Sequence, residues 1–299
     1  MKMIIKNPAP TDWRQEMWGD FHFGRSLSKY LVRNKVEVET DYYPNWNNKK
    51  EADVVLVLRG KYPYKPKKNH FNVMWNISHP EDVTLEEYEE YDLIFVASNN
   101  HAEFLKTKLS KPVYPLLQCT DIEEFTINHD VSNNDRSDFI FVGNKKGVNR
   151  PGVVWSIEIG LPLKVWGRGW ETLVQSELLM GHYIKNEELG KLYSKSKAIL
   201  NDHYEDMKKY GFINNRVFDA LACGLPVISD YHEELYNLFP NEILYYRNKE
   251  ELESVLKQII FMYPQIVDRV NKLVETIREK HTFEIRAKEI IDKINKIRI

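Results

Sequence analysis

The fold of this chain is decided by the stretch Gly211-Phe-Ile-Asn-Asn-Arg-Val-Phe-Asp-Ala-Leu-Ala-Cys-Gly-Leu-Pro-Val-Ile-Ser-Asp230. It has three parts in a fixed order. A loop with Gly and Asn comes first, an apolar segment over 215–222 predicts a short helix, and Cys223-Gly-Leu-Pro226 ends that helix before an apolar strand over 227–229. A loop that runs into a helix presents free backbone N–H groups and the positive end of the helix dipole, which suits a diphosphate.

Two polar side chains of this stretch support the same interpretation. Arg216 and Asp219 are three residues apart, so they share one face of the predicted helix. An acid one turn into such a helix can reach a ribose hydroxyl. The alternative is an ordinary ion pair on the surface. The predicted nucleotide-binding residues in this stretch are Gly211, Phe212, Ile213, Asn214, Asn215, Arg216 and Asp219.

A second candidate lies upstream, in Phe141-Val-Gly-Asn-Lys-Lys-Gly-Val-Asn-Arg150. Here a predicted strand runs into a turn bounded by glycines, and a helix follows. Gly143 would let the backbone approach a ligand closely, and the cations would neutralise a diphosphate. The alternative is a solvated basic turn. The residues that we assign to diphosphate binding here are Gly143, Asn144, Lys145 and Arg150, with Lys146 beside them.

Three further segments of the same half carry candidate residues. Trp166 ends a predicted strand, and Trp166 or Trp170 would pack a base or a sugar for which Gly167 leaves room, unless the two tryptophans are core residues. The extended segment His182-Tyr183-Ile184 would read the edge of a base through its backbone, unless it is a plain connection. Asn201 and His203 end a strand, where side chains point toward a ligand cleft, although a structural turn is the alternative.

The first half of the chain supplies candidates for catalysis. Asp20 and His22 lie in Trp18-Gly-Asp-Phe-His-Phe-Gly24, just after a predicted strand, and His79 lies at the end of another. An imidazole in such a place can hydrogen-bond a sugar hydroxyl or a phosphate, although a lone His is often a satisfied turn residue. We take His79 and Asp20 as catalytic candidates and His22 as a further cleft residue. The loop Lys61–Lys68, rich in Lys, Pro and Tyr, would contact an anionic acceptor or remain a solvated loop.

Composition restricts the class of protein. The chain has 299 residues, of which 42% are apolar and 29% charged, as in soluble globular proteins with room for two domains. The formal net charge of −2 argues against a nucleic-acid partner. The two cysteines are too few for a disulfide framework, which favours a cytoplasmic location, and no apolar run is long enough to span a membrane. Peripheral contact with the inner face of a membrane stays open.

No cofactor or metal is expected. There is no DxD after an apolar strand, and no cluster of His, Cys, Asp and Glu has the spacing of metal ligands.

Short apolar runs alternate with amphipathic stretches, which is typical of α/β proteins. Predicted strands cover 3–5, 36–38, 53–58, 72–77, 93–97, 113–117, 139–142, 163–166, 198–200 and 227–229. Predicted helices cover 23–34, 100–109, 151–159, 186–194 and 215–222, and the tail from Glu250 is helical with breaks near Pro264 and His281. Strands this apolar are usually buried on both faces, so we predict Rossmann-like parallel sheets flanked by helices.

The predicted organisation is an N-terminal domain over 1–120, a polar linker over 121–138 and a C-terminal domain over 139–280, followed by a helix over 281–299. Two such domains would place a cleft between the carboxyl ends of their sheets, where ligands bind in folds of this kind.

The motifs, taken in order, resemble the CgeB-like group near glycosyltransferase family 4, which has the two-domain GT-B fold. The resemblance is carried by Met74-Trp-Asn-Ile-Ser-His-Pro80, His182-Tyr-Ile184, Leu200-Asn-Asp-His203 and Asn215-Arg-Val-Phe-Asp-Ala-Leu-Ala-Cys-Gly224. It implies glycosyl transfer from a nucleotide sugar without a metal, with Asp219 on the ribose, Lys145 and Arg216 on the diphosphate and His182–Ile184 on the base. It also implies that the last helix packs back on the N-terminal domain, and, loosely, retention at the anomeric carbon.

The sequence departs from that family's pattern at one position. Many members carry two glutamates eight residues apart, whereas here the second is Asp219 and the first falls on Gly211.

The function expected from the resemblance is that of a glycosyltransferase with a nucleotide-sugar donor, a UDP-sugar before a GDP-sugar. The expected acceptor is a glycan, lipid-linked or protein acceptor in a bacterial surface glycan. The alternatives are a sugar-nucleotide epimerase of the same fold, with Asp20 and His79 as its acid/base pair, and a non-catalytic binding module.

Overall fold

The computed structural model describes residues 1–299 except 49, 146, 148–149 and 299. The chain divides into two compact units. Unit 1 comprises residues 1–119, 205–214 and 281–299, and unit 2 comprises residues 120–204 and 215–280. Each unit therefore contains segments that are far apart in the sequence, and the units are described separately below.

Unit 1 is built on a six-stranded parallel sheet with strand order β2-β1-β3-β4-β5-β6. Its strands are β1 (Lys2–Pro10), β2 (Glu37–Tyr43), β3 (Val54–Arg59), β4 (Phe71–Asn76), β5 (Leu93–Val96) and β6 (Val113–Pro115). Every residue of β3 is buried, because this apolar strand pairs on both sides and is covered on both faces.

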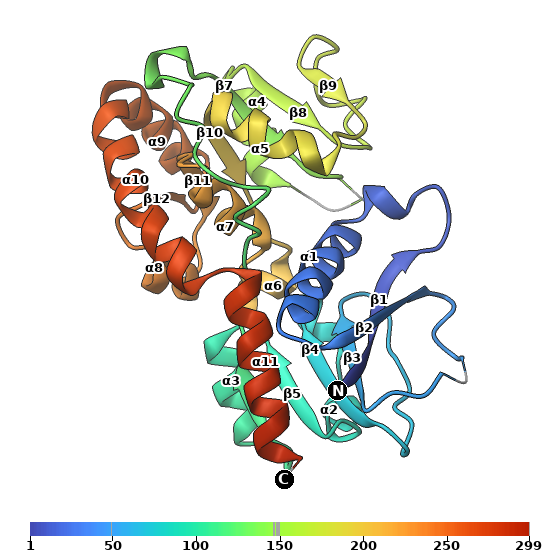
Figure 1. The fold of residues 1–299 in the computed structure, drawn as a ribbon. Coiled ribbons are helices and arrows are strands. Elements are labelled where there is room, and N and C mark those ends of the chain that lie inside the picture. Colours follow the sequence, from blue (N-terminus) through green and yellow to red (C-terminus); the bar gives the residue numbers. More distant parts are fainter. Residues whose placement is uncertain (49, 146, 148–149, 299) are drawn as a thin grey trace. The chain divides into compact units, whose positions relative to one another are not determined.

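The helices of unit 1 are α1 (Gly19–Arg33), α2 (Leu85–Glu89), α3 (Asn99–Lys106), α6 (Glu205–Lys209) and α11 (Phe283–Ile297), with short 3-10 turns at Gln15–Met17 and Pro80–Asp82. Helices α1 and α11 lie side by side, one early and one late in the chain (Figure 1). Phe23 of α1 packs edge-to-face against Phe283 of α11 and Trp75 of β4, with ring centres 4.8 Å and 5.1 Å away. Residues of α11 thus complete the core of unit 1.

The segment 205–214 also belongs to unit 1, although the sequence analysis placed it in the C-terminal domain. The Ser98 hydroxyl donates to the Tyr210 carbonyl at 2.7 Å, and Lys209 pairs with Glu81 at 2.5 Å. His101 packs against the rings of Tyr210 and Phe212. These contacts join α6 and the residues after it to α3 and the Pro80–Asp82 turn.

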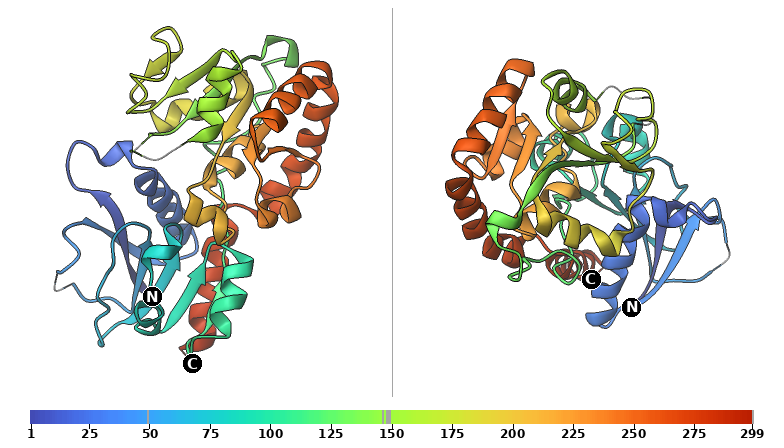
Figure 2. Two further views of the ribbon diagram at one scale, coloured as in Figure 1. Left: turned by 180° about the vertical axis from the view of Figure 1, so that it is seen from behind. Right: turned by 90° about the horizontal axis from the view of Figure 1, so that it is seen from above.

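Unit 2 has a second six-stranded parallel sheet, with order β12-β11-β10-β7-β8-β9. Its strands are β7 (Ser137–Val142), β8 (Leu163–Trp166), β9 (Leu179–Gly181), β10 (Ser196–Asn201), β11 (Val227–Asp230) and β12 (Ile243–Tyr246). Its helices are α4 (Pro151–Glu158), α5 (Asn186–Lys195), α7 (Asn215–Ala222), α8 (Glu233–Leu238), α9 (Lys249–Phe261) and α10 (Tyr263–Lys280), with a 3-10 turn at Asn133–Asp135. Helices α9 and α10 pack together along one side of this unit (Figure 2).

Local sequence signals fix the ends of several helices. Gly224, two residues after the end of α7, has φ = 65°, a left-handed conformation that favours glycine, so the Cys-Gly-Leu-Pro segment ends the helix as predicted. Thr282 caps α11 by accepting from the amide of Ile285. Pro264 lies in the first turn of α10, where its missing N–H is not needed, so the predicted break falls just before it.

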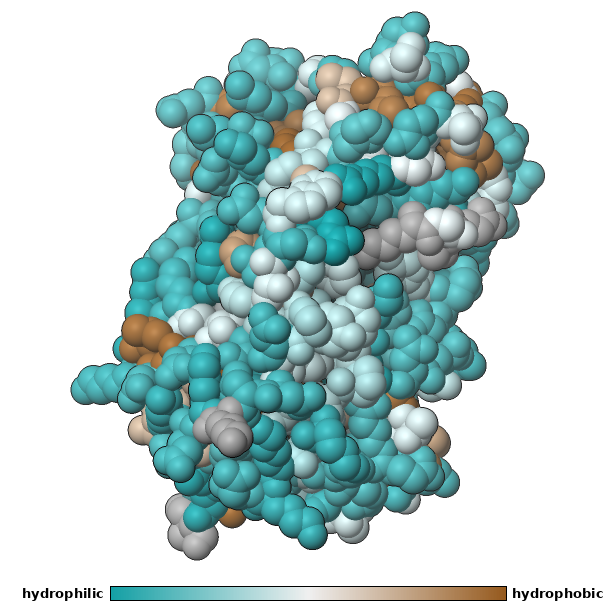
Figure 3. All heavy atoms as spheres, turned by 90° about the vertical axis from the view of Figure 1, so that its right-hand side faces the viewer, coloured by the Kyte–Doolittle hydropathy of each residue, from teal (hydrophilic) through white to brown (hydrophobic). Residues whose placement is uncertain are grey.

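The face drawn in Figure 3 is mostly hydrophilic, with apolar residues gathered only in small separate patches. In the part of the chain that the structure describes, no helix combines the length and the apolar character needed to cross a membrane.

Candidate functional site

The candidate site of unit 2 forms where three neighbouring strands end. Strand β10 lies between β7 and β11, so Gly143 after β7 and Asn201 at the end of β10 share the carboxyl edge of the sheet. Arg216, in the first turn of α7, donates to the Asn201 amide oxygen at 2.9 Å, and its guanidinium carbon lies 5.6 Å from the centre of the Phe141 ring. A partly exposed cation is therefore fixed at this edge beside a helix N-terminus.

Gly143 lies in a crowded place, where a side chain would press on its neighbours. A Cβ built on it would lie 3.2 Å from the Arg216 guanidinium and 3.2 Å from the Phe141 ring. Gly143 therefore lies close to Arg216 and Phe141, and its predicted role, to let the backbone approach a ligand, stays a prediction.

The turn after Gly143 is held by the loop after β8. The amide of Gly143 donates to the Trp166 carbonyl at 2.8 Å, and the Trp170 indole donates to the Gly143 carbonyl at 2.8 Å. Gly167 has φ = 143°, and a Cβ on it would lie 2.2 Å from the Gly143 carbonyl oxygen. Trp170 is completely buried whereas Trp166 is half-buried, so the core alternative considered for the two tryptophans applies to Trp170.

Asn144 and Lys145 belong to the same turn. The Asn144 side-chain oxygen accepts from the amide of Arg168 at 2.9 Å, and the amide of Lys145 donates to the Arg168 carbonyl at 3.0 Å. The Asn144 side chain therefore braces the two loops against each other, while the Lys145 side chain is partly exposed. Lys146 lies outside the described residues.

Arg150, which the sequence analysis assigned to diphosphate binding, is buried and has a partner within unit 2. It is 6% exposed and forms an ion pair with Asp202, at 2.5 Å between Nη1 and Oδ1. It also donates to the Asn144 carbonyl at 3.3 Å and stacks over the Tyr204 ring. Burial raises the pKa of Asp202, and the guanidinium of Arg150 opposes that rise. Arg150 thus connects Asp202 to the backbone of the turn at Asn144.

His203 forms a second buried polar pair. Its side chain is completely buried, and its Nδ1 lies 2.8 Å from the Asp230 carboxylate at the end of β11. The other carboxylate oxygen of Asp230 accepts from the backbone amide of His203 at 3.1 Å. The His232 ring packs edge-to-face on His203, and the buried Nε2 of His203 has no hydrogen-bond partner among the described residues.

Asp219 is 5% exposed and lies inside unit 2. It accepts from the Asn215 amide at 2.9 Å, whereas Arg216 bonds Asn201, so Arg216 and Asp219 have separate partners and the alternative of a surface ion pair does not apply. Burial raises the pKa of Asp219 to about 8. Near neutral pH this carboxyl holds a proton and can donate a hydrogen bond as well as accept one.

The loop before α7 belongs to unit 1 up to Asn214 and continues into unit 2 at Asn215. Phe212 and Ile213 are completely buried, and the amide of Phe212 donates to the Met207 carbonyl at 2.8 Å. Gly211 has φ = 74°, in the left-handed region. A glutamate in this backbone conformation would be strained.

The predicted base-reading segment lies just after β9. His182 is exposed and pairs with Glu171 at 3.1 Å, and Tyr183 and Ile184 are half-buried. The Gly181 carbonyl accepts from the amide of Gly167 at 2.9 Å, which connects this segment to the loop after β8.

The candidates of unit 1 lie at the carboxyl edge of its own sheet. Asp20 is in the first turn of α1, and a Cβ on Gly60 would lie 3.5 Å from its carboxylate and 3.1 Å from the Ser78 hydroxyl. His79 follows β4 with φ = 52° and lies 3.8 Å from the Asp206 carboxylate. A left-handed non-glycine residue is uncommon, and such strain gathers at functional sites. His22 instead bonds the Glu16 carbonyl at 2.7 Å.

The sequence analysis named no role for Asp202 or Asp230. Both follow apolar strands directly, in Leu200-Asn-Asp202 and Val227-Ile-Ser-Asp230, so the signal that selected Asn201 and His203 also applied to them. Among the described residues no group of three or more His, Cys, Asp and Glu side chains could hold a metal ion.

Comparisons with known proteins agree with this architecture. Residues 153–292 match the model of a family described as Glycosyl transferase-like. No curated protein matches the chain by sequence. Over 99% of both chains, the structure is similar to the sucrose-phosphate synthase of Thermosynechococcus elongatus, with a TM-score of 0.72 and 10% identity.

Two other solved structures are similar along their whole length. An alpha-glucosyltransferase in complex with UDP and a mismatched 13-mer DNA has a TM-score of 0.70 at 13% identity, over 99% of this chain and 100% of that one. Anabaena HepE in complex with UDP-glucose has a TM-score of 0.68 at 9% identity, also over 99% and 100%. The predicted GT-B fold, with two parallel-sheet α/β domains, is confirmed.

Proposed function

Since the chain is a glycosyltransferase of the GT-B fold, we propose that it transfers a sugar from a UDP-sugar to the hydroxyl of an acceptor in a surface glycan, without a metal ion. The observation that carries the proposal is the position of Arg216. Its guanidinium lies at the start of α7, beside the glycine turn at 143 and the end of β10. A diphosphate at this edge would be held by a cation and by helix N–H groups together.

The UDP-sugar donor is proposed because similar structures contain UDP or UDP-glucose. In this proposal unit 2 binds the donor, and Arg216 and Lys145 neutralise the charge that develops on the departing diphosphate. Asp219, protonated near neutral pH because of its burial, would hydrogen-bond a ribose hydroxyl. Asp20 and His79 of unit 1 are proposed to act on the acceptor hydroxyl, as a base and an orienting group.

Retention at the anomeric carbon and the CgeB-like kinship stay predictions from the resemblance. The same holds for a location in the cytoplasm with contact at the inner face of a membrane.

The first experiment is a thermal-shift panel with UDP, GDP, dTDP and ADP in the presence of EDTA. A saturating nucleotide adds stability by mass action, so UDP should raise the melting temperature by about 2–4 °C for each kcal/mol that its binding adds to the free energy of unfolding. Arg216→Ala should lose most of this rise. Arg247→Ala, which removes an exposed arginine of the same unit, should keep it. No rise with any of the four nucleotides would reject the proposal.

The second experiment separates transfer from epimerisation. NMR spectra of UDP-glucose incubated with the protein alone should stay unchanged, and UDP should be released only when an acceptor is added. A new epimer in the absence of acceptor would replace the transferase with an epimerase that uses Asp20 and His79. Full biological activity of both Arg216→Ala and Asp219→Ala would favour a non-catalytic binding module.

A further inference from the structure

A row of aromatic rings crosses the carboxyl edge of the unit 1 sheet. Tyr43 and Tyr62 are stacked, with ring centres 3.9 Å apart and planes 7° apart, and Trp18 lies roughly parallel to Tyr62 at 6.4 Å. On the other side Tyr43 meets Trp46 edge-to-face at 5.5 Å, and Trp46 meets Tyr64 at 6.1 Å. The row thus runs through five rings.

The rings come from the ends of three adjacent strands. Tyr43 ends β2, Trp18 follows β1, and Tyr62 and Tyr64 follow β3, while the sheet places β1 between β2 and β3. Ligands of open α/β sheets bind outside the carboxyl ends of the strands. Gly60, two residues before Tyr62, is the residue on which a Cβ would approach the Asp20 carboxylate. The aromatic row therefore begins next to a proposed catalytic group.

One half of the row is buried and the other half is not. Trp46 and Tyr64 are each 3% exposed, whereas Trp18, Tyr43 and Tyr62 are half-buried and keep part of their surface in contact with solvent. A core function would bury all five rings. The buried rings fix the position of the partly exposed ones.

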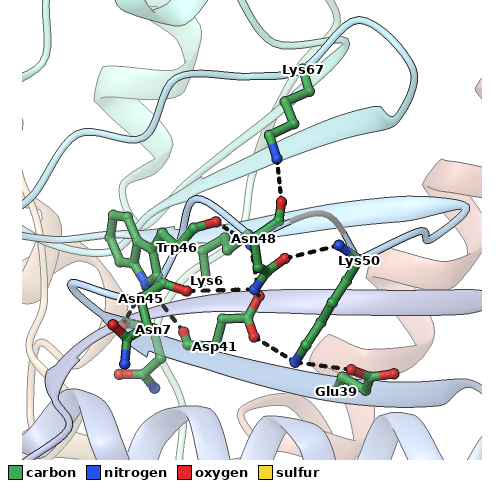
Figure 4. Close-up of polar contacts among 9 residues, drawn as sticks. All are labelled: Lys6, Asn7, Glu39, Asp41, Asn45, Trp46, Asn48, Lys50 and Lys67. Atoms are coloured by element: carbon green, nitrogen blue, oxygen red, sulfur yellow. Dashed lines mark hydrogen bonds and ion pairs between the residues drawn. The ribbon is translucent and has the colours of Figure 1, made fainter.

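A buried polar network holds the base of the row (Figure 4). The Lys6 ammonium, 2% exposed, donates to the Asp41 carboxylate at 2.7 Å and to the Trp46 carbonyl at 2.8 Å. The Trp46 indole donates to the carbonyls of Asn7 and Asp41, both at 3.1 Å. Trp46 is thereby held at both its backbone and its ring.

The loops that carry the rings are tied to the same network. Lys50 donates to Asp41 at 2.8 Å, Asn48 donates to Asp41 at 2.6 Å, and Lys67 donates to the Asn48 carbonyl at 2.5 Å. The loop after β2 is thus bonded to the loop after β3. Rings held in this way lose little freedom when a ligand binds, which favours affinity.

We infer that Trp18, Tyr43 and Tyr62 form a stacking platform that binds pyranose rings of the acceptor glycan. One face of a pyranose presents C–H groups with slight positive charge, and these pack on the negative face of an aromatic ring. Lys61, whose ammonium lies 5.6 Å from the Tyr62 ring centre, is exposed and can donate to a sugar hydroxyl. Nucleobases also stack on such rings, but the net charge of −2 disfavours a nucleic-acid acceptor. The inference rests on the proposed function and names the acceptor class.

The test measures binding of neutral oligosaccharides to the full chain by saturation-transfer NMR, with maltose, cellobiose, chitobiose and mannobiose as probes. At least one probe should receive saturation on its ring C–H protons from the wild-type protein. Tyr62→Ala should weaken its binding at least about fivefold, since one stacked ring is worth about 1 kcal/mol. Tyr62→Phe, which keeps the ring, should bind as the wild type does. Tyr236→Ala, which removes a partly exposed tyrosine from an aromatic cluster of unit 2, should leave binding unchanged.

The UDP thermal shift of each variant is recorded in parallel. If UDP stabilises the protein but no probe binds, or if Tyr62→Ala binds the probe as well as wild type, the platform is rejected while the donor proposal stands. If a single-stranded DNA 13-mer binds through Tyr62 and the oligosaccharides do not, the acceptor class is wrong. If an oligosaccharide binds through Tyr62 and no nucleotide stabilises the protein, the platform stands and the donor proposal fails. An equal loss in Tyr62→Phe would also overturn the stacking argument.

Discussion

Arg150 and Asp202 are 52 positions apart in the sequence, yet they form a buried ion pair of 2.5 Å directly beneath the glycine turn of unit 2. Both residues are less than a tenth exposed. The pair joins the start of α4 to the end of β10. Arg150 also donates to the Asn144 carbonyl, so the pair is bonded to the turn that carries Asn144 and Lys145.

Arg150→Met should destabilise unit 2 by about 3–5 kcal/mol, because it leaves a buried carboxyl without its cation. Urea unfolding followed by circular dichroism measures the loss. The double variant Arg150→Met/Asp202→Leu should regain a large part of it, because no buried charge is left unpaired. A double variant as unstable as the sum of the two single variants would show that the pair is not coupled.

Gly167→Ala should be far more damaging than an ordinary glycine replacement. The new Cβ would lie 2.2 Å from the Gly143 carbonyl oxygen, so the two loops must separate, at a cost of about 3 kcal/mol or more. Gly160→Ala is the matched control, since that glycine also has positive φ, 80°, but open space around its Cβ position. It should cost only about 1 kcal/mol of backbone strain. Equal melting temperatures for the two variants would contradict the close contact.

Asp219 should make the protein less stable as the pH rises. Its pKa is about 8 in the fold against an ordinary 3.8, so between these values the folded chain holds a proton that the unfolded chain has released. The free energy of unfolding therefore decreases through this window. In Asp219→Asn the decrease between about pH 5 and about pH 8 should be smaller. Asp268→Asn, an exposed acid of the same unit, should keep the wild-type slope, and an unchanged slope in both variants would exclude Asp219 as the cause.

His101 should have the opposite effect, in acid. Burial lowers its pKa from 6.5 to about 4, so the unfolded chain takes up a proton first and stability is lost as the pH falls through that range. His101→Phe, in a site lined by Tyr88, Phe104, Tyr210 and Phe212, should reduce this loss. Thermal melts at several pH values measure it, with the exposed His129→Phe as the control. A steeper loss in His101→Phe would contradict the assignment.

Local signals were sufficient for most of the elements. The predicted strand over 163–166 and the predicted helix over 215–222 agree with β8 and α7 residue for residue. Apolar runs bounded by Gly and Pro made those elements visible. Helix α6 was missed because its five residues, Glu205–Lys209, are mostly charged and show no helical period. Strand β12, Ile243–Tyr246, was missed although it is a short apolar run of the kind that predicted its neighbours.

The candidate site could be predicted only in part from the sequence, because its contacts join residues that are far apart along the chain. The turn at Gly143 and the helix start at Arg216 were each found from local sequence. Their close approach, in which a Cβ built on Gly143 would lie 3.2 Å from the Arg216 guanidinium, depends on the strand order of the sheet. Arg150 was assigned to diphosphate binding, and its ion pair with Asp202 was not predicted because the two residues are 52 positions apart. The aromatic row was not predicted for the same reason. Its rings Trp18, Tyr43 and Tyr62 come together only because β1, β2 and β3 are neighbours in the sheet.

The assignment of α11 to unit 1 has a consequence for synthesis on the ribosome. Phe283, Ala287, Ile290 and Ile294 belong to the core of unit 1, but all of unit 2 is translated before them. During translation part of the apolar surface of the unit 1 sheet therefore stays uncovered until α11 has been synthesised. The sequence of unit 2 is complete earlier, so unit 2 can fold first. Nascent chains are then expected to expose an aggregation-prone face until residue 294 has left the exit tunnel.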